Sequence, residues 1–137
     1  MSDNRETELL RKDAENGNAE SQNRMGDKYY LGDGFDRDYA EAAKWYRLAA
    51  KQGYAPAQST LGCMLLTGKG VVRDEKEGLS LVRAAAESGH PTALHDLGVV
   101  YLEGKLVPKD PDKAKEYFRR SAQQGFAPAI DALKLFE

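Results

Sequence analysis

The dominant feature of the sequence is an internal repeat with a period of 36 residues. Glycine, alanine and arginine each recur four times at this interval, and two further glycines and an aspartate recur once in each full repeat. A fixed period of this length indicates an array in which each unit packs on its neighbours. The four-membered columns are Gly17, Gly53, Gly89 and Gly125; Ala14, Ala50, Ala86 and Ala122; and Arg11, Arg47, Arg83 and Arg119.

Each period is predicted to form two helices, termed helix A and helix B. Helix A covers about 20–31, 56–67 and 92–103, where apolar residues recur with helical spacing. The glycines that follow it occupy the position of a left-handed C′ residue; they are Gly32, Gly68 and Gly104. The recurring aspartates, Asp38, Asp74 and Asp110, are predicted to cap the N-terminus of helix B. Glu41 and Glu77 are predicted to complete capping boxes there, and Pro111 fills the first helical position in the third repeat.

A further glycine column lies inside helix A, where glycine is unfavourable by about 1 kcal/mol relative to alanine. Its members are Gly26, Gly62 and Gly98. Their recurrence predicts that the backbone of a neighbouring helix approaches there too closely for a side chain. The alanine column indicates the same close contact from helix B. Helices A and B are therefore expected to pack as an antiparallel hairpin, and successive hairpins to stack.

The sequence thus predicts an all-α fold, an α-solenoid of three helix-turn-helix repeats that forms an α/α superhelix. Partial units cover the two exposed ends of the stack, as solenoids require. The predicted organisation is a single repeat domain over 1–137, with an N-terminal capping helix at about 6–17, repeats at 18–53, 54–89 and 90–125, and a C-terminal capping helix at 126–137.

The motif of the first repeat is Met25-Gly26, Tyr29, Gly32, Gly34, Asp38, Ala42, Trp45, Ala49-Ala50 and Gly53. This spacing resembles the Sel1-like repeat (SLR) family, a relative of the tetratricopeptide class, and the resemblance extends over nearly the whole chain. Leu106 replaces the second loop glycine of the third repeat, and Gly78 stands where the other repeats have alanine. The resemblance implies an α-solenoid that acts as an adaptor or scaffold, with helix A lining its concave face.

Composition excludes several classes of function. The net charge is −2, and no basic face indicates a nucleic-acid partner. The apolar runs are too short to predict insertion into a membrane. The polar, acidic N-terminus is unlike a secretory signal, which predicts a cytoplasmic protein, or a periplasmic or secreted one if a signal has been removed. No cofactor or metal is expected, because the single cysteine, Cys63, cannot build a multi-cysteine site. A monomer is favoured.

Few residues suggest catalytic chemistry. The glycine pairs around Asp33 and Lys69 lack the Lys-Ser/Thr of a phosphate-binding loop and read as turns. His95 lies close in register to Cys63, so a cysteine–histidine hydrolase is a minor alternative. His90 precedes a proline and is expected to cap a helix. Trp45 and Tyr117 read as core residues, and the arginine column either bonds to the adjacent repeat or forms a basic surface for an acidic ligand.

Residues of helix A that the repeat motif does not use form one helical stripe and are the candidate partner-binding residues. The leading hypothesis is a non-enzymatic adaptor that binds a protein or peptide through this stripe. The alternatives are an inhibitor or immunity-type protein that neutralises a toxin or effector through the same surface, and burial of the stripe between neighbouring A helices. The candidates are Asn23, Asp27, Tyr30, Leu31, Ser59, Cys63, Leu66, Thr67, His95, Val99, Leu102, Glu103, Asp131 and Leu135.

Overall fold

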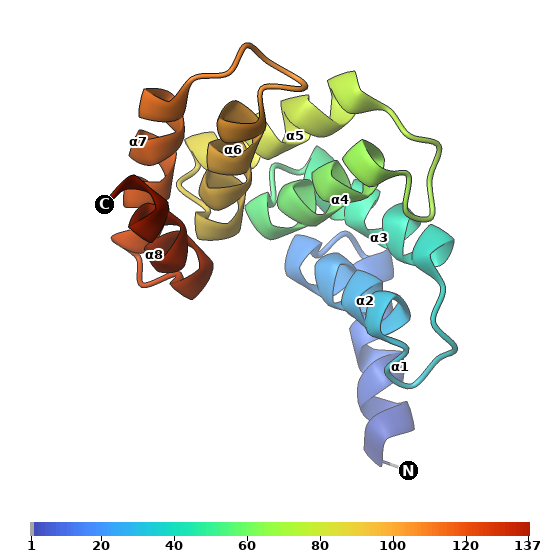
Figure 1. The fold of residues 1–137 in the computed structure, drawn as a ribbon. Helices are drawn as coiled ribbons and strands as arrows, with labels where there is room; N and C mark the ends of the chain where they lie inside the picture. Colours follow the sequence, from blue (N-terminus) through green and yellow to red (C-terminus); the bar gives the residue numbers. More distant parts are fainter. Residues whose placement is uncertain (1) are drawn as a thin grey trace. The chain divides into compact units, whose positions relative to one another are not determined.

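The computed structural model describes residues 2–137, with side chains from Asn4 onward. Met1, the first residue of the predicted domain, lies outside the described residues. Within this range every regular element is a helix (Figure 1). The elements in chain order are α1 (Ser2–Glu15), α2 (Ala19–Leu31), α3 (Tyr39–Lys51), α4 (Ala55–Thr67), α5 (Glu75–Glu87), α6 (Pro91–Glu103), α7 (Pro111–Ala122), α8 (Ala127–Leu133) and the short 3-10 helix η1 (Lys134–Phe136).

The predicted pairing of helices is confirmed. Helix A of the three repeats is α2, α4 and α6, each beginning one residue before its predicted start and ending where expected. Helix B is α3, α5 and α7. The end helices α1 and α8 take the places of a lone helix B and a lone helix A, although α1 begins at Ser2, earlier than predicted. The C′ glycines of helix A have φ between 70° and 75°, and the glycines that follow helix B are also left-handed.

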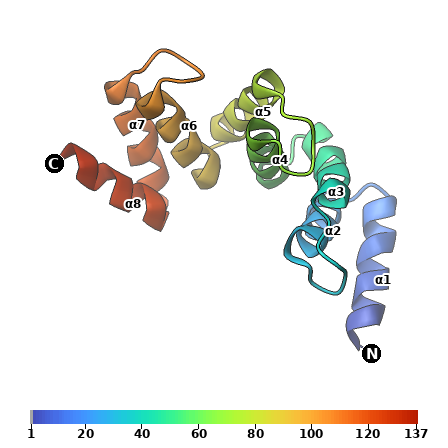
Figure 2. The same ribbon diagram turned by 45° about the vertical axis from the view of Figure 1, so that its right-hand side comes forward.

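The chain divides into two compact units, one ending at Leu81 and the other beginning at Val82, and each is described by itself. In the first unit α2 and α3 form a closely packed hairpin, with α1 beside α2 and α4 beside α3 (Figure 2). Its main core is rich in alanine around Tyr46, Leu61 and Met64, all nearly inaccessible to solvent. A smaller cluster of Leu10, Ala14 and Met25 holds α1, and Trp45 packs against it as predicted.

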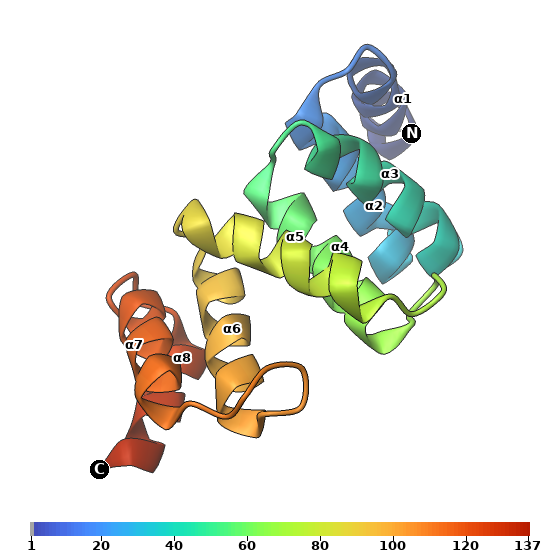
Figure 3. The same cartoon turned by 90° about the horizontal axis from the view of Figure 1, so that it is seen from above.

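In the second unit α6 and α7 form the equivalent hairpin, and α8 packs on α7 (Figure 3). Tyr101, Ala114 and Phe118 are the centre of its core, and the ring of Tyr117 lies against them as predicted. The C-terminal residues of α8 and η1 cover the same cluster with Ala132, Leu133 and Phe136. The single-domain organisation of the whole chain stays a prediction.

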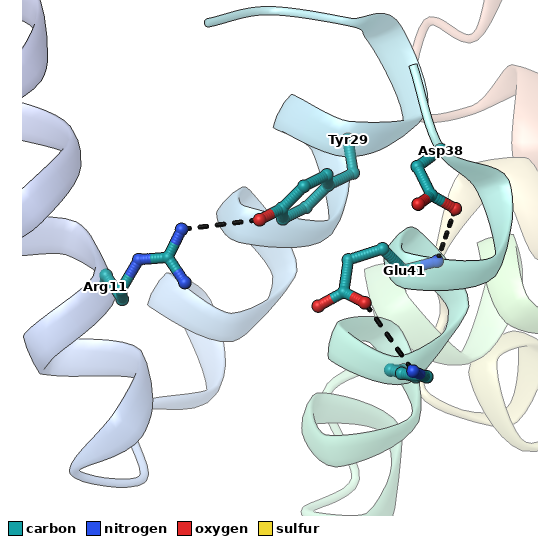
Figure 4. Close-up of polar contacts among 5 residues, drawn as sticks. Arg11, Tyr29, Asp38 and Glu41 are labelled. Atoms are coloured by element: carbon teal, nitrogen blue, oxygen red, sulfur yellow. Dashed lines mark hydrogen bonds and ion pairs between the residues drawn. The ribbon is translucent and has the colours of Figure 1, made fainter. Parts of the chain in front are cut away.

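Each recurring aspartate joins the two helices of its hairpin. The carboxylate of Asp38 accepts a hydrogen bond from the backbone N–H of Glu41 at 3.0 Å, as predicted for an N-cap (Figure 4). The backbone N–H of Asp38 also donates to the carbonyl of Tyr29 at 2.9 Å. Asp74 and Asp110 repeat both bonds at the same distances. One residue therefore starts helix B and ties it to helix A.

The same bonds show that the predicted capping boxes are wrong. A capping box needs the Glu41 side chain to accept from the backbone N–H of Asp38. That N–H is already bonded to Tyr29, so the Glu41 carboxylate turns instead to the ammonium group of Lys44 (Figure 4). The carboxylate of Glu77 likewise pairs with Arg47.

Two of the glycines inside helix A, Gly26 and Gly98, face aromatic rings. At these two positions the prediction of a backbone approach is wrong. A Cβ at Gly98 would lie 2.5 Å from the ring of Phe118, and a Cβ at Gly26 would lie 2.7 Å from the ring of Tyr46. Backbone does meet backbone at Gly78 on α5, where a Cβ would lie 2.9 Å from the carbonyl oxygen of Gly62. This contact explains why glycine replaces the alanine of the other repeats at that position.

Glutamine side chains, which the sequence analysis did not single out, link consecutive helix pairs. The Gln52 amide nitrogen donates to the carbonyl of Gly17 and to the side-chain oxygen of Gln22, both at 2.9 Å. Gln22 in turn donates to the carbonyl of Ala14. In the second unit the Gln124 amide donates to the carbonyl of Gly89 in the same way. These bonds tie the glutamines to the last turn of α1 and to the glycine turns that follow helix B.

Replacing the capping carboxylate provides a test of the aspartate links. Asp38→Ala should lower the free energy of unfolding by about 1 kcal/mol, because the free N–H of Glu41 loses its acceptor. Asp36→Ala is the matched control, since Asp36 is an exposed loop residue with the same charge. Urea denaturation measures both, and equal losses in the two variants would contradict the assignment.

Gly98→Ala tests the close contact with Phe118. An alanine in a helix interior normally stabilises by about 1 kcal/mol relative to glycine. Here the added methyl group meets a buried ring, so we expect a net loss of about 1–3 kcal/mol in thermal or urea unfolding. Phe118→Leu should lower the free energy of unfolding by less in the Gly98→Ala background than in the wild type. If the losses from the two substitutions are simply additive, the contact is contradicted.

Candidate protein-interaction surface

The predicted partner-binding stripe is divided between the two units. Its residues on α2 and α4 belong to the first unit, and those on α6, α8 and η1 belong to the second. We call the first group the first-unit flank; it comprises Asn23, Asp27, Tyr30, Leu31, Ser59, Cys63, Leu66 and Thr67.

Asp27 is anchored to the core of its hairpin. Its carboxylate accepts a hydrogen bond from the hydroxyl of Tyr46, the buried ring that faces Gly26. Burial raises the pKa of the Tyr46 hydroxyl well above its usual range, and the hydrogen bond to Asp27 adds to the rise. The hydroxyl therefore remains a donor, and one oxygen of the flank carboxylate has a fixed position.

Tyr30 is the centre of a cluster of aromatic and cationic side chains. Its ring packs edge-on to Tyr39 with the centroids 5.0 Å apart. The ammonium of Lys69 lies 5.1 Å above the Tyr30 ring and 4.7 Å above the Tyr39 ring, within cation–π range, and donates to the Tyr30 hydroxyl at 3.2 Å. That hydrogen bond is the main reason why the pKa of Lys69 is raised. The loop after α4 thus partly covers Tyr30.

Sequence reasoning missed Lys69 and Tyr39 as members of this surface. The stretch Gly68-Lys69-Gly70 forms a turn, as predicted, and its second glycine has an additional role. A Cβ at Gly70 would lie 2.5 Å from the Cβ of Tyr39, so only glycine lets the loop approach α3 this closely. The sequence carries no local signal for this cluster, because Lys69 lies 39 residues from Tyr30.

The remaining residues of the first-unit flank differ in exposure. Leu31, at the end of α2, is 65% exposed, and Thr67 is also exposed. Leu66 is half-buried because it fills the space in front of Gly78, and Cys63 is half-buried on α4. Ser59 is only 2% exposed in this structure, and as a partner-binding residue it stays a prediction.

On α6 the apolar positions of the stripe are used for packing within the second unit. Val99 and Leu102 lie against the core of Tyr101, Ala114 and Phe118, which α8 and η1 also cover. The ring of His95 lies 5.4 Å from that of Phe118 and 5.6 Å from that of Phe126. Much of the surface of these three side chains is therefore buried by packing within the second unit, and is not available to a partner.

The polar members of the stripe in the second unit are solvated. Glu103 pairs with Lys105 at 3.8 Å, and Asp131 pairs with Lys134 at 3.3 Å. Surface pairs of this kind contribute little to stability. Leu135 in η1 is 73% exposed. As partner-binding residues, these three stay predictions.

The members of the arginine column use different partners. Arg11 donates to the hydroxyl of Tyr29 at 3.3 Å (Figure 4), whereas Arg47 pairs with the carboxylate of Glu77 in the next repeat. Arg119 reaches only Glu116 on its own helix. Arg83 lies over the ring of Tyr101. The expected bond to a carbonyl or carboxylate of the adjacent repeat is thus confirmed for Arg47 alone.

The residues considered for catalysis lie in separate units, Cys63 in the first and His95 in the second. In the part of the chain with described side chains, no group of His, Cys, Asp or Glu is arranged to hold a metal ion. Among the helices described, none is both long enough and apolar enough to cross a membrane.

His90 occupies the N-cap position of α6, as expected, but its side chain makes no capping hydrogen bond. Burial lowers the pKa of its imidazole below 6.5, although the carboxylate of Asp96 acts in the opposite direction. The neutral form is therefore the one that the fold favours.

Helix pairs that repeat with one spacing and one set of caps define a helical-repeat protein. A family model for the Sel1 repeat matches the chain three times, at residues 19–54, 55–90 and 91–126. The chain therefore belongs to the Sel1 repeat family, and each matched repeat begins one residue later than predicted. Sel1 repeat proteins generally mediate protein–protein interactions.

Two solved structures are similar over most of this chain. A Sel1 repeat protein from Oxalobacter formigenes is 36% identical with a TM-score of 0.81, and the match covers 95% of this chain and 98% of that one. A protective antigen present in uropathogenic Escherichia coli strains, with an SLR fold, is 35% identical with a TM-score of 0.85. That match covers 92% of this chain and spans 27% of the antigen's length. Among curated proteins, the comparison found no similar sequence.

The state of His90 predicts a pH dependence of stability. Between the lowered folded pKa and the unfolded value of 6.5, the unfolded chain binds more protons, so the free energy of unfolding rises with pH. Acidification from pH 7.5 to pH 5.5 should therefore destabilise the wild type. Urea unfolding at several pH values should show a smaller loss of the free energy of unfolding in His90→Gln than in the wild type. An identical slope in His90→Gln would contradict the prediction.

Proposed function

We propose that this chain is a non-enzymatic adaptor that binds a protein partner through the first-unit flank. The observation that carries the proposal is the 65% exposure of Leu31 beside the cluster of Tyr30, Tyr39 and Lys69. An exposed leucine next to aromatic rings offers apolar area together with one positive charge. Membership of a family that generally mediates protein interactions supports the same function.

The fixed geometry of the flank suits recognition. The ring of Tyr30 is held by Tyr39 and Lys69, and the carboxylate of Asp27 is held by the Tyr46 hydroxyl. Side chains that are already ordered lose little conformational entropy when a partner binds. We therefore infer that the partner places an apolar side chain on Leu31 and an acidic or hydrogen-bonding group near Lys69.

Placing a charge at the exposed leucine tests this proposal. Leu31→Lys should weaken partner binding by about tenfold or more, because burial of a leucine side chain contributes about 1.5–3 kcal/mol. Lysine is compatible with the last turn of a helix, so the melting temperature should remain close to that of the wild type. The partner is first identified by affinity capture and mass spectrometry, and its affinity is then measured with the purified protein.

Val72→Lys is the matched control, because Val72 is an apolar loop residue of the same unit and is 90% exposed. It should bind the partner as the wild type does. Equal weakening by the two substitutions would indicate a general effect of charge. Undiminished binding by Leu31→Lys would remove the flank as the interaction surface.

A further inference from the structure

A small cavity in the second unit is formed by helices that contribute nothing to the first-unit flank. Its volume is about 270 Å³, and its walls come from α5, α6 and α7. This is below the roughly 300–1,000 Å³ of typical small-molecule sites, so it suits one side chain better than a cofactor. We call it the arginine cavity, after two of its lining residues, which are Arg83, Ala86, Glu87, Leu97, Tyr117 and Arg120.

Each of the two guanidinium groups lies over the ring of one of two stacked tyrosines. Arg83 lies 5.8 Å from the centroid of the Tyr101 ring, and Arg120 lies 5.8 Å from that of Tyr117. The two rings stack on each other at 5.7 Å with an angle of 14°. A guanidinium that stacks on a ring keeps the N–H groups around its edge available for hydrogen bonds. The cavity is therefore lined by two guanidinium groups, each with N–H donors that can bind a ligand.

Neither of these arginines has an acidic partner. Within residues 4–137, the contacts of Arg83 and Arg120 are with aromatic rings, whereas Arg47 and Arg119 each pair with a glutamate. Arg83 belongs to the recurring arginine column, and in this repeat it leaves its hydrogen-bonding capacity unused. Two such donors at one cavity favour an anion, because a guanidinium fork matches the geometry of a carboxylate or phosphate.

The other lining residues indicate which anion fits. Ala86 and Leu97 line the cavity but are each only 2% exposed, so most of its accessible lining is polar. Glu87 is exposed at the cavity and offsets one of the two positive charges. The lining therefore carries a net charge of +1 from two arginines and one glutamate, which matches a singly charged group. A phosphate, with close to two charges near neutral pH, is matched less well.

We propose that the arginine cavity binds the carboxylate of an acidic side chain from a protein partner. The carboxylate accepts hydrogen bonds from the guanidinium groups of Arg83 and Arg120. This site is separate from the first-unit flank, so the failure of either proposal leaves the other intact.

The wild-type protein can be tested without any substitution. N-acetylglutamic acid amide, which carries one side-chain carboxylate, should saturably shift the NMR signals of the side-chain Nε–H groups of Arg83 and Arg120. The expected dissociation constant for such a small probe is on the order of 1 mM. The neutral isostere N-acetylglutamine amide should leave these signals unchanged. Equal shifts with both probes, or no saturation, would overturn the proposal, and tighter binding of inorganic phosphate would overturn the choice of carboxylate.

Substitutions then assign the site. Arg83→Gln and Arg120→Gln should each weaken binding by about tenfold, because each removes a charge-assisted hydrogen bond. Arg119→Gln, the adjacent arginine with its own partner, should change binding by less than about twofold. Glu87→Gln should strengthen binding by about threefold, since it removes the like charge. Misfolding cannot produce that gain, so unchanged or weaker binding by Glu87→Gln would count against the site.

Discussion

The hairpin depends on a pair of hydrogen bonds made by one aspartate. Its carboxylate accepts a hydrogen bond from the N–H of the third residue of helix B, and its own N–H donates to a carbonyl of helix A nine residues earlier. The second bond fixes the length and path of the loop, because the first residue before helix B is tied to a defined place on helix A. Each of the three repeats has this arrangement, so each hairpin places its exposed side chains in the same way.

The variable residues between these fixed points give the two units different surfaces. In the first unit the loop glycine Gly70 allows Lys69 to reach the tyrosines of the preceding repeat, and Leu31 remains exposed nearby. In the second unit the apolar stripe residues Val99 and Leu102 pack against the core cluster of Tyr101, Ala114 and Phe118. Residues of α8 and η1 pack against the same cluster, so these apolar side chains take part in the core of the second unit.

The fold could be predicted because its determinants are local and recur. Asp38 and Gly32 each act within a few residues of their own helix, so a single sequence shows their roles. The interaction surfaces were less predictable because they join residues from different repeats. The contact of Lys69 with Tyr30 spans 39 residues, and nothing in either residue's own neighbourhood indicates it. The capping box failed for a similar reason, since the N–H of Asp38 was already bonded to Tyr29.

The glutamine links have a consequence for where the folded body can be cut. The match to the Sel1 repeat begins at residue 19, yet Gln22 and Gln52 donate to the carbonyls of Ala14 and Gly17. A fragment trimmed to the matched repeats would leave both amides without these acceptors and would uncover the side of Met25 that Leu10 and Ala14 protect. A fragment designed to fold on its own should therefore include α1, which covers this side of the first repeat.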